Sequence, residues 1–188
     1  MTDRVSTNME RYILYSGNVS KRYGIADFVT IFLKANVPIN FYICGEGDYS
    51  DELQEISKKE DKIEYLGLLD KPTVFKLQRR ASLLVNPRSY NDEYTKYSFP
   101  SKTMEYLLSG TPVMMERLLG IPDEYYQYII EVPANGWRDA LRNFCARTED
   151  ENRELGNAGR RFVLESKGII TQGRKIVDFI FNGSEGDK

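Results

Sequence analysis

Short apolar runs alternate with segments of helical periodicity along most of this chain of 188 residues. A run such as Leu83 to Val85 is too short for a helix and lacks the polar–apolar alternation of a half-exposed strand. Such a run is typical of a strand that is covered on both faces of a parallel sheet. Its regular alternation with helical segments predicts an α/β fold, namely a doubly wound Rossmann-like parallel sheet of about six strands with helices on both faces.

The two patterns also place the expected elements. The expected strands cover Tyr12–Ser16, Ile39–Cys44, Ile63–Leu66, Leu83–Val85, Pro112–Met115 and Ile129–Val132. The expected helices begin at Ile25 and then cover Tyr49–Lys59, Pro72–Ala81, Pro100–Ser109, a helical or irregular stretch over Ile121–Tyr128, and three late stretches near Trp137–Arg147, Glu151–Ser166 and Thr171–Phe181. We expect a flexible lead-in over residues 1–11, one domain over residues 12–181 and a polar tail over residues 182–188.

Composition excludes several classes of function. The net charge of -2 provides no basic field for nucleic acid. The chain has no histidine, which excludes a Ser-His-Asp triad, a Cys-His dyad and a histidine-based metal site. We expect Cys44 and Cys145 to be reduced thiols rather than a disulfide. No signal peptide precedes Arg11 and no apolar run approaches the roughly 20 residues of a membrane span, so we expect a cytoplasmic protein.

The segment after Leu83–Val85 holds the strongest candidate for a ligand site. Pro100 predicts a helix start, because proline is favoured at the first helical position. The backbone N–H groups of Ser101 and Lys102 would then lack partners within the helix and would form an anion site. Glu105, one turn further on the same side, would be placed to accept hydrogen bonds from a pair of sugar hydroxyls. An ordinary helix start with a solvated Glu105 would account for the same residues.

The segment from Tyr97 to Val113 resembles the donor-site segment of retaining GT-B glycosyltransferases, in particular glycosyltransferase family 4 of bacterial polysaccharide biosynthesis. In that family a Glu, seven residues and a second Glu precede a small residue and Gly-x-Pro-Val. Glu105 matches the second Glu, which binds the nucleotide ribose in the family. Tyr97 stands in place of the first Glu, which contacts the donor sugar, and Glu93 on the preceding loop is our alternative for that contact.

The resemblance also implies a cation that contacts the donor pyrophosphate from the loop after the first strand. The family has Gly-Arg and, a few residues later, Lys-Gly at this loop. This chain has Gly17-Asn18 and Tyr23-Gly24 instead, so its cations are out of register. We predict Arg22 first and Lys21 second as the catalytic cation, although two solvent-exposed surface cations would account equally well for the pattern.

Ligands of doubly wound sheets bind at the carboxyl ends of the strands, and further donor contacts are predicted there. Gly45 and Gly47 match a Gly-x-Gly of the family, and Gly67 and Leu68 match the segment that meets the nucleotide base. Arg88 is placed either to face the phosphates or to pin the following loop. The full set of predicted substrate-binding residues is Gly17, Gly45, Gly47, Gly67, Leu68, Arg88, Glu93, Tyr97, Ser98, Phe99, Ser101, Lys102 and Glu105.

By resemblance, the chain is the carboxyl-terminal, nucleotide-sugar-binding half of a GT-B enzyme. The implied reaction moves a sugar from a nucleotide-sugar to a saccharide or lipid-linked acceptor with retention, without a metal or other cofactor, in cell-surface polysaccharide synthesis. We expect an amino-terminal acceptor domain or a separate chain as partner, which could bring the protein to the inner membrane face. The isolated chain is expected to bind donor weakly and to transfer little.

Three other functional classes stay open. The first is a non-catalytic nucleotide-sugar-binding subunit of a split glycosyltransferase. The second is a sugar-nucleotide epimerase, for which the histidine-free chain offers no evident acid and base. The third is a receiver-type signalling domain, which needs acidic residues at the end of the first strand, where Ser16, Gly17 and Asn18 stand.

Overall fold

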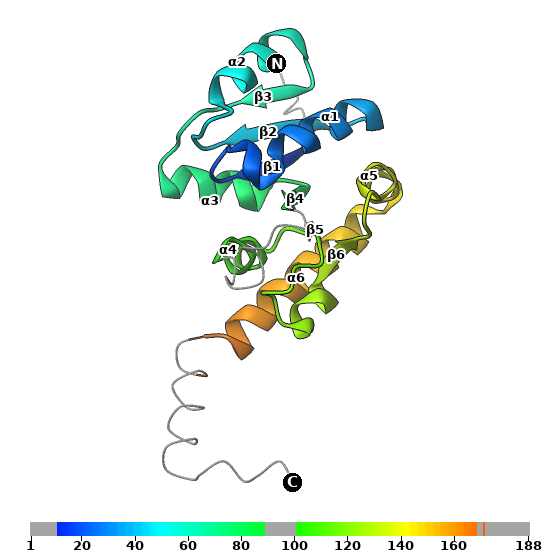
Figure 1. The fold of residues 1–188 in the computed structure, drawn as a ribbon. Coiled ribbons are helices and arrows are strands. Elements are labelled where there is room, and N and C mark those ends of the chain that lie inside the picture. The colour runs from blue at the N-terminus through cyan, green and yellow to red at the C-terminus, as the bar shows by residue number, and fades with distance from the viewer. Residues whose placement is uncertain (1–10, 89–100, 169–170, 172–188) are drawn as a thin grey trace, which may run out of the picture.

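A computed structural model describes residues 11–88, 101–168 and 171 of the chain. Its strands form one parallel sheet in the order β3-β2-β1-β4-β5-β6 (Figure 1). The strands are β1 (Tyr12–Ser16), β2 (Asn40–Cys44), β3 (Ile63–Tyr65), β4 (Leu83–Asn86), β5 (Val113–Glu116) and β6 (Ile129–Val132). The predicted α/β class and the doubly wound Rossmann-like sheet are confirmed.

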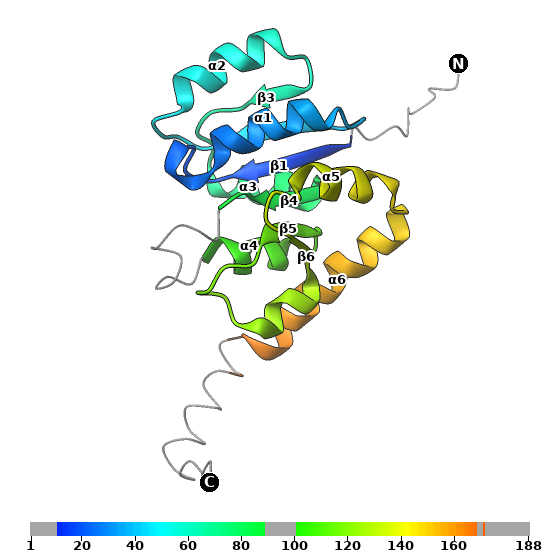
Figure 2. The same ribbon diagram turned by 45° about the vertical axis from the view of Figure 1, so that its right-hand side comes forward.

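Helices cover both faces of this sheet. One face carries α1 (Ile25–Ala35), α2 (Ser50–Lys59) and α5 (Trp137–Ala146), and the other carries α3 (Lys71–Arg80), α4 (Ser101–Ser109) and α6 (Glu149–Ser166). In Figure 2, α1 and α3 lie on opposite sides of β1. The neighbouring residues Ile13 and Leu14 of β1 belong to different core clusters and are both fully buried, as expected for a strand covered on both faces.

The order of the strands reverses between β1 and β4. From β1 the chain winds outward through β2 to β3, and it then crosses back to β4 on the other side of β1. In a doubly wound sheet the carboxyl ends of the strands on either side of such a switch leave a crevice in which ligands bind. The topology therefore points to the ends of β1 and β4, where residues 17–24 and residues 87–88 leave the sheet.

Several element boundaries differ from the prediction, and helix capping explains where α6 and α3 begin. The helix expected from Glu151 begins at Glu149, because the Thr148 hydroxyl accepts the Glu151 N–H at 3.2 Å and the Glu151 carboxylate accepts the Thr148 N–H at 2.8 Å. α3 begins at Lys71, where the Asp70 carboxylate accepts the Thr73 N–H at 2.7 Å. The loop after β1 includes one 3-10 turn, η1 (Lys21–Tyr23). Pro100 and, apart from its first residue, the helix expected near 171–181 lie outside the described residues.

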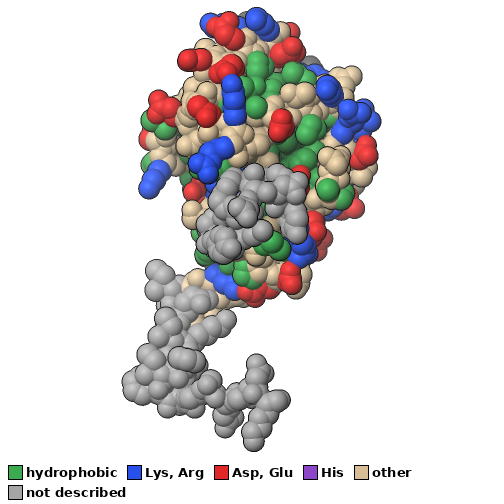
Figure 3. Space-filling view, in the orientation of Figure 1, with side chains coloured by type: hydrophobic (Ala, Val, Ile, Leu, Met, Phe, Trp, Pro, Cys, Tyr) green, Lys and Arg blue, Asp and Glu red, His purple; other side chains and the backbone are tan. Residues whose placement is uncertain are grey.

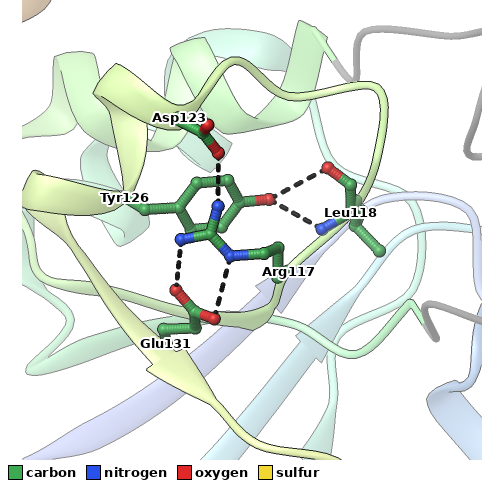
Figure 4. A network of polar contacts seen from close by, with 5 residues as sticks. All are labelled: Arg117, Leu118, Asp123, Tyr126 and Glu131. Atoms are coloured by element: carbon green, nitrogen blue, oxygen red, sulfur yellow. Dashed lines mark hydrogen bonds and ion pairs between the residues drawn. The ribbon is translucent and has the colours of Figure 1, made fainter.

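A cluster of polar contacts fastens the connection between β5 and β6, which includes the 3-10 helix η3 (Asp123–Tyr128) (Figure 4). The Arg117 guanidinium donates two hydrogen bonds to Glu131 of β6, at 3.0 and 2.9 Å, and also binds Asp123. It lies over the ring of Tyr126, 4.2 Å from the centroid. The Tyr126 hydroxyl accepts the Leu118 N–H at 2.7 Å. Together these contacts hold the outer strand β6 and η3 to the end of β5.

The surface carries charges of both signs. In Figure 3, Lys and Arg side chains are interspersed with Asp and Glu side chains over the face in view. Within the described ranges, no helix combines the length and the apolar character that crossing a membrane requires.

Candidate functional site

A cavity of about 320 Å³ opens at the carboxyl ends of β1 and β2, beside the first turn of α4. Its walls come from four parts of the fold: the strand ends, the connection between β3 and α3, α3 itself, and α4. The lining residues are Ser16, Gly17, Asn18, Cys44, Gly45, Glu46, Leu68, Leu69, Val74, Lys102 and Glu105. The cavity thus lies next to the switch point and brings together predicted site residues that are far apart in the sequence.

Ser16, the last residue of β1, holds two helices to this edge of the sheet. Its backbone N–H donates to the Tyr106 hydroxyl of α4 at 2.9 Å, and its side-chain oxygen accepts a hydrogen bond from the Gln78 amide of α3 at 3.0 Å. Its carbonyl accepts a hydrogen bond from the Lys102 ammonium. Ser16, Gln78 and Tyr106 are all buried. This network fixes the first turn of α4 relative to β1.

Lys102 places a cation on the cavity wall. Its ammonium lies against Gly17, since a Cβ built on Gly17 would be 2.6 Å from the lysine nitrogen. It also lies over the ring of Tyr106, 5.3 Å from the centroid. Burial lowers the pKa of Lys102, while the negative charge of Glu105 acts in the opposite direction. The lysine is therefore a desolvated cation that is held in place by β1.

Glu105 presents a carboxylate to the same cavity one turn further along α4. The side chain is solvent-exposed, and the Gln78 amide donates to its Oε1 atom. A carboxylate in this position can accept hydrogen bonds from two neighbouring hydroxyls. Cys44 lies at the end of β2, where burial raises the pKa of its thiol to about 11. The Cys44 thiol therefore stays protonated near neutral pH and is a poor nucleophile.

The family of this chain follows from its sequence. The sequence model of the family described as "Glycosyl transferases group 1" matches residues 10–146. The chain belongs to this family. The comparison with curated proteins finds no match.

Solved structures of glycosyltransferases share the fold of this group 1 domain. Sucrose-phosphate synthase from Thermosynechococcus elongatus is 23% identical with a TM-score of 0.68, over 93% of this chain and 46% of that chain. TarM from S. aureus, in a structure with UDP, is 17% identical with a TM-score of 0.67, over 95% and 36%. HepE from Anabaena, in complex with UDP and glucose, is 13% identical with a TM-score of 0.69, over 92% and 49%. The chain spans about half or less of the length of these proteins.

Two glycines of this glycosyltransferase domain permit close packing of the strand ends around the cavity. Gly45 has a φ of 132°, and a Cβ built on it would lie 1.7 Å from the Gly17 carbonyl oxygen. The Gly45 N–H donates to the carbonyl of Gly67 at 2.8 Å. Gly47 donates its N–H to Ser50 at 3.1 Å at the start of α2. Gly67 thus adjoins the cavity through Gly45, and neither Gly67 nor Gly47 lines it.

The cations predicted for pyrophosphate contact lie elsewhere. The Lys21 ammonium pairs with Glu52 at 2.6 Å and borders a different hollow. The guanidinium groups of Arg22 and Arg88 lie over the ring of Tyr23, at 5.3 and 4.7 Å. None of the three lines the described cavity. The roles of Lys21, Arg22 and Arg88 stay predictions.

Four predicted site residues, Glu93, Tyr97, Ser98 and Phe99, lie outside the described residues. Ser101 opens α4 as an exposed residue and does not line the cavity, whereas Leu68, 72% exposed, forms an apolar wall beside Leu69 and Val74.

Sequence reasoning missed the residues that hold Glu105 and Lys102 in place. Gln78 falls on the stripe of α3 that Val74 and Leu77 turn toward the core, and Ala81 continues this stripe just after the helix. A polar residue on an apolar stripe is a signal that its side chain has a buried partner. Tyr106 gives a weaker signal, because a tyrosine can pack in a core without any role for its hydroxyl.

Proposed function

We propose that this domain binds the nucleotide-sugar donor of a retaining glycosyltransferase. The reaction moves a sugar to a saccharide or lipid-linked acceptor in cell-surface polysaccharide synthesis. One observation carries this proposal: Lys102 and Glu105, one turn apart on the same side of α4, face one cavity whose other wall is built from Gly17 and Gly45.

The cavity offers suitable partners for each part of a nucleotide-sugar. Glu105 would accept hydrogen bonds from the two ribose hydroxyls, with Gln78 holding its carboxylate in place. Gly17 and Gly45 bring the ends of β1 and β2 close together beside the positive end of α4, where a diphosphate would bind. The exposed Leu68 would cover the base. Oriented N–H groups and a cation, rather than a metal, would stabilise the negative charge on the leaving diphosphate.

The acceptor would be held by an amino-terminal domain or by a separate chain. The length of the solved relatives supports this division, because this chain matches about half or less of each. In the proposal the protein works in the cytoplasm and reaches the inner membrane face through that other domain. The chain alone would bind donor weakly and transfer little sugar.

Calorimetry with UDP-, GDP- and ADP-sugars tests the proposal on the full chain. We expect one nucleotide class to bind, and Glu105→Gln to weaken its binding by about tenfold or more, because a charge-assisted hydrogen bond to the ribose is lost. Glu55→Gln is the matched control, since Glu55 lies on the exposed side of α2 and pairs with Lys58. If the wild-type chain binds none of these nucleotide-sugars, the proposal is wrong.

A second candidate is a non-catalytic donor-binding subunit of a split glycosyltransferase. It is favoured by Asn18 and Tyr97, which replace the Arg and the Glu that the family carries. A tagged chain would then recover a second polypeptide that transfers sugar by itself and is accelerated by this subunit. If the recovered polypeptide transfers sugar only when this chain is present and Glu105 is intact, the catalytic role holds.

A further inference from the structure

The donor cavity needs a cation, and the loop after β1 does not supply one in the described structure. A nucleoside diphosphate brings negative charge into a partly buried site, where an unpaired charge is costly. Lys21 is engaged by Glu52, and Asn18 stands where the family has Arg. Among the residues that line the described cavity, Lys102 is the only cation.

The Lys102 ammonium is held in position by the protein itself. It is held by the Ser16 carbonyl at the end of β1, and it rests on Gly17, whose missing side chain leaves the space that it fills. An ammonium has three donors, and within the described part of the chain the Ser16 carbonyl takes one of them. No other described residue accepts from the ammonium, which leaves two donors to meet ligand oxygens. Preorganised donors of this kind need no rearrangement when an anion binds.

The surroundings of Lys102 also suit an anion. Glu105 is the one carboxylate on α4, and its Oε1 atom already accepts a hydrogen bond from Gln78. The desolvated cation therefore has no tight ion pair to break among the described residues, and a charged ligand would interact with it more strongly than in water.

We infer that the Lys102 side chain is the cation that binds the donor diphosphate, in place of the cations that relatives carry in the loop after the first strand. The inference rests on the proposed donor-binding function and assigns to the Lys102 side chain a role that the sequence reasoning gave only to its backbone N–H. It shifts the diphosphate contact from the β1 loop to α4, the helix that also carries Glu105.

The test compares nucleoside diphosphates with the matching nucleosides on the full chain. UDP, GDP and ADP, and then uridine, guanosine and adenosine, are titrated into wild type, Lys102→Met and the control Lys58→Met, which removes an exposed lysine of α2. We expect Lys102→Met to weaken binding of the preferred diphosphate by about tenfold or more and to leave nucleoside binding unchanged. Lys58→Met should behave like wild type.

Gly17→Ala provides a second variant that keeps the lysine but displaces its ammonium, because the new Cβ would lie 2.6 Å from the lysine nitrogen. It should also lose diphosphate affinity selectively, and it decides the question if Lys102→Met fails to fold. Unchanged diphosphate binding in Lys102→Met, or its loss in Arg22→Met instead, overturns the inference while the proposed function stands. A wild-type chain that binds no diphosphate overturns the proposed function itself.

Discussion

At the scale of single residues, the cavity depends on backbones that approach more closely than any side chain would allow. Gly45→Ala should lower the free energy of unfolding by several kcal/mol, because a Cβ there would lie 1.7 Å from a backbone oxygen of Gly17 and the φ of 132° is strained for any other residue. Gly67→Ala is the matched control: its φ is also positive, at 64°, but a Cβ would meet nothing within 4 Å. Its loss should be only about 1 kcal/mol. Urea unfolding of both variants checks this. Equal losses of stability would show that the backbone shifts to relieve the contact between Gly17 and the new Cβ.

At the scale of elements, α6 owes its start to a cap rather than to a broad apolar face. Its buried residues include two glycines and Asn152, so packing alone defines its first turn weakly. Thr148→Ala should lower the free energy of unfolding by about 1 kcal/mol, because the Glu151 N–H loses its acceptor. Thr30→Ala is the control, since the Thr30 hydroxyl donates to the Ala26 carbonyl in the middle of α1, where alanine is the better helix former. Thermal unfolding of both variants checks this: the unfolding midpoint of Thr148→Ala should lie below that of Thr30→Ala. Similar midpoints for the two variants would contradict a role for the cap.

The elements were largely predictable, whereas their side-chain partners were not. Strands such as Leu83–Asn86 are marked by apolar runs, and the Thr148-x-x-Glu151 pattern that sets the start of α6 is visible in the sequence. The bond from Gln78 to Glu105 needs α3 and α4 side by side over β1, which follows from the strand order and not from local pattern. Periodicity also does not say where a flexible cation points, and Lys21 turns to Glu52 on α2 rather than to the cavity.

At the scale of the whole molecule, the sheet concentrates buried ionisable groups at one edge. Cys44, Lys102 and Tyr106 all lie where β1 and β2 end under α4, and burial favours the neutral form of each: it raises the pKa of Cys44 and Tyr106 and lowers that of Lys102. The same edge carries the proposed donor site. The part of the fold that is proposed to bind the donor should therefore also shape the response of global stability to pH.

The buried thiol of Cys44 predicts in which direction stability changes with pH. Burial raises the pKa of its thiol from an ordinary 9.0 to about 11, so between these values the folded chain keeps a proton that the unfolded chain releases. Its stabilising contribution, roughly 2 to 3 kcal/mol, is complete below pH 9.0 and is lost as the pH rises through about 11. We expect Cys44→Ala to lose less stability over this range than wild type, as measured by urea unfolding at successive pH values. Groups that are present in both proteins contribute alike to the two pH profiles and largely cancel in the difference. Cys145→Ala, at a half-buried thiol, should change the pH dependence of stability less than Cys44→Ala does. Parallel pH profiles for wild type and Cys44→Ala would mean that the fold accommodates the Cys44 thiolate without loss of stability.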